Sequence, residues 1–207
     1  MEAIVATEAS KGERTRSSLV TAAVTRFANE GFRRTSLADI ARDVGITPAA
    51  VYRYFPDKEA LFIAAVAADA AALIDLVRSS FFDQLGTSFQ TAGPRVARRF
   101  MAAIGDHPLV ARVLRGGEPM SPDRIHALPH LSALRAEVET LLGVGQQAGI
   151  VRQDVDVSQM ALGLETIILY QLAHLATLDK PDLRKENARW TAVAAVLEAA
   201  LLPGTAP

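Results

Sequence analysis

Cysteine is absent from this chain of 207 residues, which excludes disulfide bonds and thiolate metal sites. Aromatic residues make up only 6%, with a single tryptophan, and no P-loop, G-x-G-x-x-G motif or nucleophile motif is present. His126 and His130 have the spacing of a helical metal pair, but Pro129 between them argues against a regular helix there. We therefore expect no enzymatic activity, no metal and no cofactor.

Long uninterrupted apolar runs are also missing, although half of the residues are hydrophobic. Asp69, Glu165 and Glu198 interrupt the most apolar stretches, so no run approaches the roughly 18 residues of a membrane span. Residues 1–12 lack the apolar segment of a signal peptide. These absences predict a soluble, cytoplasmic protein with no membrane-spanning part.

Charge is nearly balanced over the whole chain, at a formal net charge of −1, but it is unevenly distributed. Residues 10–58 contain nine Lys or Arg against five Asp or Glu, a balance of +4, so the remainder sums to −5. A basic N-terminal quarter on an acidic body is typical of a chain whose N-terminal part contacts a polyanion. An ordinary solvated surface fits the same excess, so charge alone does not decide.

Only helical patterns are present, because the sequence has no Asn-Gly or Asp-Gly hairpin and no sustained period-2 alternation. This predicts an all-α fold of about nine helices. Ser10 and Glu13 fit a capping box that begins the first helix, and Gly31 provides its left-handed stop. Segments 81–94 and 116–129 are expected to be loops.

Two short helices follow the first one. The earlier of them begins after Ser36 and ends at Gly45. Thr47 can cap the later one, with Pro48 at its first position, and Pro56 stops it after barely two turns. A long fourth helix, capped by Asp57, is then expected to reach about Ser80.

A longer helix followed by two short ones is the composition of a three-helix DNA reader, in which the last helix enters the major groove. The small residues from Thr47 to Ala50 allow close approach to base edges, and Tyr52 and Arg53 can reach bases or backbone. Val51 and Phe55 are expected to face inward. Any one of these residues also fits a purely structural role, and only the constellation is specific.

Phosphate contacts are expected beside this reader. Thr35 and Ser36 offer hydroxyls and free backbone N–H groups at a helix start, Lys58 can reach the other side of the groove, and Tyr54 can donate its hydroxyl to a phosphate. With the positive potential of Arg34 and its neighbour Arg33, the predicted DNA-binding residues are Arg34, Thr35, Ser36, Thr47, Pro48, Ala49, Ala50, Tyr52, Arg53, Tyr54 and Lys58.

The stretches Gly31–Val44 and Gly45–Leu61 closely resemble the signature of TetR-family transcriptional regulators, in a gapless similarity over residues 14–62. The resemblance implies that Thr47, Ala49, Ala50, Tyr52 and Arg53 lie on the recognition helix, and that Thr35, Ser36, Tyr54 and Lys58 hold phosphates. It also implies a flexible N-terminal arm at 1–9, a helix-turn-helix domain at 10–57, and a ligand-binding and dimerisation domain at 58–207.

The last two expected helices, at 158–178 and 185–202, are apolar nearly all round, and a second copy of the chain can cover the excess apolar surface. This predicts a homodimer with two-fold symmetry, as the family resemblance also implies. The expected interface residues are Leu162, Ile168, Leu169, Leu172, Trp190, Val193 and Leu197.

The middle helices carry a looser apolar pattern, which in the resembled family surrounds a small-molecule pocket. The candidate ligand-binding residues are Phe100, Met101, Ile104, His107, Leu114, Leu134, Val138, Glu165 and Tyr170. We expect a repressor that binds a palindromic double-stranded DNA operator and leaves it when a small apolar or amphipathic inducer binds. A ligand-independent DNA-binding protein or an activator of the same fold remains the alternative.

Overall fold

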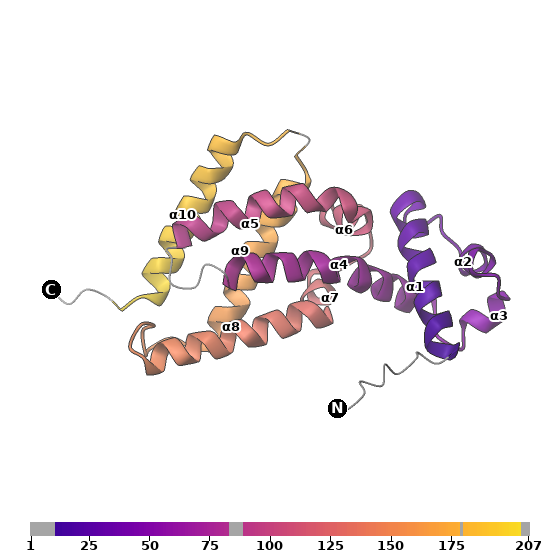
Figure 1. Ribbon diagram of the computed structural model, residues 1–207, viewed down its shortest axis with the longest axis horizontal. Helices are drawn as coiled ribbons and strands as arrows, with labels where there is room; N and C mark the ends of the chain where they lie inside the picture. Colours follow the sequence, from indigo (N-terminus) through magenta and orange to yellow (C-terminus); the bar gives the residue numbers. More distant parts are fainter. Residues whose placement is uncertain (1–10, 83–88, 179, 204–207) are drawn as a thin grey trace, which may run out of the picture. The chain divides into compact units, whose positions relative to one another are not determined.

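The computed structural model describes residues 11–82, 89–178 and 180–203. Over these ranges the chain forms ten α-helices, one 3₁₀ helix and no strand, which confirms the expected all-α fold. The chain divides into two compact units, Met1–Asp69 and Ala70–Pro207. Figure 1 shows the helices coloured along the sequence. The division lies inside the fourth helix, whereas the sequence led us to expect a boundary before that helix.

The N-terminal unit is built from α1 (Lys11–Glu30), α2 (Leu37–Val44), α3 (Pro48–Val51) and the first half of α4 (Lys58–Phe82). Gly31 and Gly45 follow α1 and α2 with φ values of 81° and 75°, which confirms the left-handed stop expected at Gly31. Ser10, the expected cap of α1, lies outside the described residues.

Three phenylalanines join α1, the turn after it and α4 at the centre of this unit. Phe27 and Phe62 meet edge to face at 5.1 Å between ring centroids, and Phe32 meets Phe62 at the same distance. Phe27 and Phe62 are fully buried, and burial of a phenylalanine side chain stabilises a fold by about 1.5–3 kcal/mol. The first turns of α4 are therefore part of the N-terminal core.

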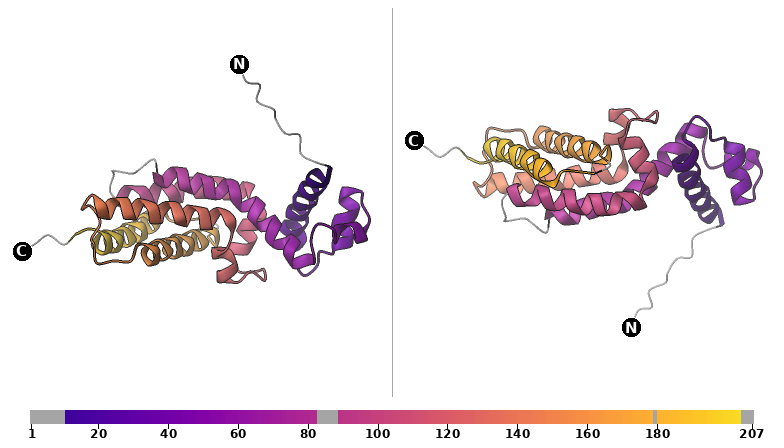
Figure 2. Two further views of the ribbon diagram at one scale, coloured as in Figure 1. Left: turned by 90° about the horizontal axis from the view of Figure 1, so that it is seen from below. Right: turned by 90° about the horizontal axis from the view of Figure 1, so that it is seen from above.

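The C-terminal unit continues through the rest of α4 into α5 (Phe89–Ala103), η1 (Ile104–Asp106), α6 (Pro108–Leu114), α7 (Pro122–His126), α8 (Pro129–Gln147), α9 (Val157–Ala176) and α10 (Leu183–Leu201). Within this unit α10 packs against α5, and α8 packs against α9, as the two further views in Figure 2 also show. One core cluster joins α8, α9 and α10 through Leu142, Leu164 and Leu197.

Both expected loops were wrong in part. The segment 116–129 contains the short helix α7, because Ser121 caps it by accepting a hydrogen bond from the Arg124 amide and Pro122 occupies its first position. In the segment 81–94, α5 already begins at Phe89, with Pro94 inside it. Pro94 is the sixth residue of α5, where it removes the hydrogen bond to the Gln90 carbonyl and crowds that carbonyl, yet helix is present on both sides of it.

Trp190 of α10 sits directly on Gly93 of α5. A Cβ atom built on Gly93 would lie 2.6 Å from Cε3 of the indole, so only glycine permits this close approach. Trp190 is 5% exposed. The indole, which the sequence analysis assigned to the dimer interface, therefore packs mainly against its own chain.

One described helix is long and apolar enough to cross a membrane by length and composition. The span Lys58–Ser80 of α4 reaches a mean hydropathy of 2.2 despite Asp69, which the sequence analysis had taken as an interruption. Since its side Leu61, Phe62, Ala65 and Val66 is buried in the N-terminal unit, α4 behaves here as a core helix.

Candidate nucleic-acid interface

The recognition element is short and capped at its start. Thr47 lies in extended conformation, and its Oγ1 accepts a hydrogen bond from the Ala50 amide at 3.3 Å. Pro48 follows at the first helical position, where its missing N–H costs nothing. Val51 and Phe55 are buried at 0% and 3% exposure, which confirms that they face inward.

The opposite side of α3 faces solvent. Tyr52 is 58% exposed, the highest exposure of a large apolar side chain in the described part of the N-terminal unit. The other predicted reading residues are also exposed, except Ala50 and Tyr54, which are half-buried: Thr47, Pro48, Ala49 and Arg53. A solvent-facing row of small side chains that ends in a tyrosine and an arginine can enter a DNA groove.

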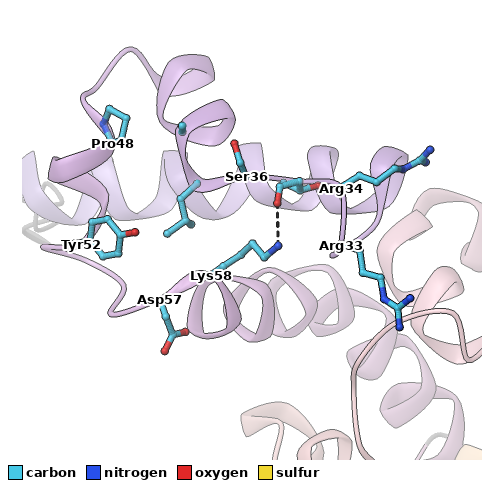
Figure 3. A pocket seen from close by; sticks show the side chains of 10 residues that line it. Arg33, Arg34, Ser36, Pro48, Tyr52, Asp57 and Lys58 are labelled. Carbon is cyan, nitrogen blue, oxygen red and sulfur yellow. Dashed lines mark hydrogen bonds between the residues drawn. The ribbon is translucent and has the colours of Figure 1, made fainter.

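A groove of about 520 Å³ lies between the starts of α2 and α4 and the side of α3. Figure 3 shows Tyr52 and Lys58 extending into it, while the carboxylate of Asp57 points away. Six of the predicted DNA-binding residues line this groove, namely Arg34, Thr35, Ser36, Pro48, Tyr52 and Lys58. Thr47, Ala49, Ala50, Arg53 and Tyr54 lie outside its lining.

The groove is electropositive. Its lining contains the cations Arg33, Arg34 and Lys58 against one carboxylate, Asp57. The first residues of α2, Leu37 and Ala38, also line it. Their amides belong to the first turn, which has no intrahelical acceptor, so cations and free N–H groups share one concavity. This combination suits a phosphate group.

Thr35 does not have the expected role of a phosphate ligand. The residue is 2% exposed, and its hydroxyl donates to the Gly31 carbonyl at 2.9 Å. Its backbone amide donates to the same carbonyl at 3.3 Å. Both donors are consequently used inside the turn, where they fix the chain between α1 and α2.

Ser36 acts first as the cap of α2. Its Oγ accepts from the Asp39 amide at 3.1 Å and donates to Asp39 Oδ2 at 2.6 Å. This hydrogen bond, followed by the pairing with Arg42, lowers the pKa of Asp39. The hydroxyl predicted to bind phosphate is therefore engaged, and the amides behind it are the better donors.

A clamp that the sequence analysis missed holds α2 on α1. Arg26 of α1 donates from Nε and Nη2 to the two carboxylate oxygens of Asp43 at 2.6 and 2.9 Å, and from Nη1 to Glu30 at 2.7 Å. The hydrogen bond from Arg26 lowers the pKa of Asp43. The i,i+4 spacing of Arg26 and Glu30 was visible in the sequence, but the pairing across two helices was not.

The predicted ligand-binding residues are only partly inside the C-terminal unit. Phe100 is buried, and Met101, Ile104, His107, Leu114, Leu134 and Val138 are half-buried. Tyr170 is 72% exposed, because it lies on the outer side of α9, so it is wrong as a pocket residue within one chain.

Glu165 is buried but already paired. Its carboxylate accepts from Nη1 of Arg135 at 2.8 and 3.0 Å and contacts Nδ1 of His126 at 2.5 Å. This ion pair links α7, α8 and α9. Because both carboxylate oxygens have protein partners, Glu165 is a structural tie and not the free ligand contact that we expected.

The predicted dimer residues also divide. Leu172, Trp190 and Leu197 are buried within one chain at 5–8% exposure, so little of their surface is left for a partner. Ile168, Leu169 and Val193 are half-buried, and Leu162 is 45% exposed. The apolar pattern all round α9 and α10 had suggested that a second chain covers them. Within one chain, however, α8 and α5 already pack against α9, and α5 packs against α10.

Comparison with known proteins agrees with this geometry. Residues 19–65 match the family model described as bacterial regulatory proteins, tetR family. Residues of this chain are 35% identical over 63 positions to the nucleoid occlusion factor SlmA of Mannheimia succiniciproducens, a match that covers 30% of this chain and 26% of SlmA. The aligned part thus spans about a quarter of that relative.

Solved structures share the whole fold. A TetR-family transcriptional regulator of Mesorhizobium loti aligns over 94% of this chain and 100% of its own, with a TM-score of 0.61 and 20% identity. The regulator FadR of Bacillus subtilis, solved with stearoyl-CoA, aligns over 89% and 98%, with a TM-score of 0.60 and 20% identity. The family match thus covers the helix-turn-helix region, and these structures show that the chain as a whole shares their fold.

Replacement of Asp43 by Asn should flatten the acid dependence of stability. A carboxylate with a lowered pKa stabilises the fold above its unfolded pKa, about 3.9, and this contribution is lost as the pH falls below it. Thermal melting followed by circular dichroism between pH 7 and pH 3 measures the effect. The variant should melt lower at pH 7 and lose less on acidification; an unchanged pH dependence would remove the clamp from the account. Asp106→Asn, which replaces an exposed carboxylate of the C-terminal unit outside any such ion pair, is the control.

Proposed function

We propose that the chain is a homodimeric regulator that binds a two-fold symmetric DNA operator through α3 and the groove beside it. The observation that carries the proposal is the combination of a solvent-facing α3, ending at Tyr52, with a cationic groove at the start of α2. Two such helices about 34–36 Å apart read two half-sites in successive major grooves, which one short helix alone reads weakly.

Roles within the site follow from exposure. Ala49 and Tyr52 face outward and are suited to contact base edges, with the alanine methyl against thymine methyl groups. Arg33 and Arg34 and the first amides of α2 supply the phosphate contacts, which give affinity and register without sequence information.

Replacement of Tyr52 by Ala should weaken operator binding about tenfold or more, because an exposed contact to DNA contributes about 1–3 kcal/mol. The melting temperature should stay unchanged, since the ring is mostly in solvent. Fluorescence anisotropy with a labelled duplex selected by the wild-type protein measures the affinity. Asn29→Ala, exposed on α1, is the control. Equal affinities for the wild type and Tyr52→Ala would take Tyr52 out of the interface.

Dimerisation is proposed through the outer sides of α9 and α10. Leu162 and Tyr170 are exposed at 45% and 72% on α9, and Val196 and Leu202 at 62% and 45% around the end of α10. Among the described residues, α10 also presents a row of exposed alanines: Ala188, Ala192, Ala195 and Ala199. Small residues beside larger apolar ones allow two helices to approach closely, so a second copy fits this surface.

Val196→Glu should convert the dimer to a monomer, because the interface would bury an unpaired charge. Sedimentation velocity measures the mass, and the same variant should bind a single half-site weakly. Ile150→Glu, which also replaces an exposed apolar residue but lies beyond α8, should leave the mass unchanged. A wild-type protein that is monomeric at micromolar concentration would refute the proposed dimer.

A small ligand is proposed within the C-terminal unit, and Gln171 of α9 is its candidate polar contact. Gln171 is 8% exposed, and in the described part of the chain its side chain has no hydrogen-bond partner. Among the described residues, every fully buried side-chain nitrogen or oxygen has a hydrogen-bond partner. The amide atoms of Gln171 must therefore retain some contact with solvent. A largely buried amide without a protein partner suits the hydroxyl or carbonyl group of an amphipathic molecule. Stearoyl-CoA, with which FadR of Bacillus subtilis was solved, is also amphipathic.

The proposed repressor is released when the ligand binds its DNA-free state more tightly than its DNA-bound state. Primary alcohols from hexanol to hexadecanol are a suitable panel. One or more should raise the melting temperature of the wild type and weaken operator binding, and Gln171→Leu should reduce both effects while remaining folded. Constant operator affinity and constant melting temperature across this panel would favour a ligand-independent regulator, and in vitro transcription would separate repression from activation.

A further inference from the structure

Lys58, the first residue of α4, has an ammonium group that is already surrounded by protein. Its Nζ donates to the Phe32 carbonyl at 2.9 Å and to the Thr35 carbonyl at 3.1 Å. The same atom lies 4.3 Å from the ring centroid of Phe32. Figure 3 shows the side chain running from α4 to the turn that precedes α2. Two carbonyls and one ring face therefore account for the three N–H donors of this cation.

The two carbonyls belong to the turn that places the start of α2. Inside this turn Gly31 O accepts from both the amide and the hydroxyl of Thr35, so that carbonyl is satisfied locally. Lys58 satisfies the carbonyls of Phe32 and Thr35 from outside. The residue directly after Thr35 is Ser36, the cap of α2, whose following amides line the groove. The position of these amides is thus tied to the first residue of α4.

We infer that Lys58 is a positioning residue that locks the start of α2 onto α4, and that it does not itself bind a phosphate. The inference rests on the proposed DNA binding of the same groove. A phosphate could take one of these two donors from Lys58 only by displacing a charge-assisted hydrogen bond and leaving a carbonyl of the turn without its partner. By contrast, the amides at the start of α2 and the side chain of Arg33 can receive a phosphate without breaking the turn. Arg34 donates from Nε to the Glu30 carbonyl at 2.9 Å, and its Nη groups can receive a phosphate while that bond is kept.

The salt dependence of DNA binding separates the two roles. Removal of one phosphate-binding cation lowers the slope of log K against log salt concentration by about 0.9, hence about 1.8 for a dimer. Lys58→Met keeps the length and apolar stem of the side chain and removes the donors. We expect it to lower operator affinity about tenfold with an unchanged salt slope, and Lys58→Arg, which restores donors to the carbonyls, to recover most of the affinity. Arg34→Met removes a proposed phosphate-binding cation from the same groove. This variant should lower the salt slope and so shows the size of the reduction that loss of a phosphate contact produces.

Two controls keep the outcomes distinct. Thermal melting tests whether Lys58→Met is folded. If that variant is unfolded, the ¹⁵Nζ resonance of Lys58 in the wild-type protein distinguishes the two roles. A positioning role predicts that this resonance stays unchanged when the selected duplex is added. A fall in slope of about 1.8 for Lys58→Met, unaltered affinity of that variant, or a ³¹P coupling to Nζ in the complex would overturn the positioning role. A wild-type protein that binds no duplex at any salt concentration would instead refute the proposed DNA binding.

Discussion

The burial of two side chains, Val51 and Phe55, holds the recognition element in place. α3 has only four residues, and a helix this short is unstable alone because nucleation is unfavourable. Val51 at 0% exposure and Phe55 at 3% anchor its inner side, and Arg16 of α1 lies 4.9 Å above the ring of Phe55. The outer side is then free of packing demands. The small residues on the outer side of α3 and Tyr52 therefore have no packing role in the core that would limit their suitability for DNA contacts.

The elements around α3 form a single scaffold. The phenylalanines of α1, the following turn and α4 pack together, Arg26 clamps α2 to α1, and Lys58 joins the turn to α4. Each connection uses a different interaction: apolar packing, a bidentate ion pair and a charge-assisted hydrogen bond to backbone. The start of α2, the proposed phosphate site, is consequently fixed from two sides in the protein alone, which would reduce the ordering cost of binding.

Local signals in the sequence predicted much of this unit, because caps and stops act within a few residues. Thr47 caps α3 as expected, α2 begins directly after Ser36, and Gly31 ends α1. Contacts between distant residues were beyond such signals. The burial of Thr35, the carbonyl partners of Lys58 and the pairing of Glu165 with Arg135, thirty positions away, depend on how helices pack.

The C-terminal unit was predicted less well for the same reason. An apolar helix surface shows that something covers it, but not whether the cover is the same chain or a partner. Trp190 is covered by α5 within its own chain, whereas Leu162 and Val196 remain exposed. The polar residue that the apolar pattern concealed, Gln171, became apparent only once its burial and its lack of a partner among the described residues were known.

The central claim is that a two-fold pair of α3 helices binds duplex DNA. Selection from a library of random-sequence duplexes by the purified full-length chain, followed by the mass of the complex in sedimentation, tests it most directly. The account predicts enrichment of an inverted repeat with half-site centres about one helical turn or a small multiple apart, bound by an even number of protomers. A library that remains unenriched after repeated rounds at low salt would contradict it.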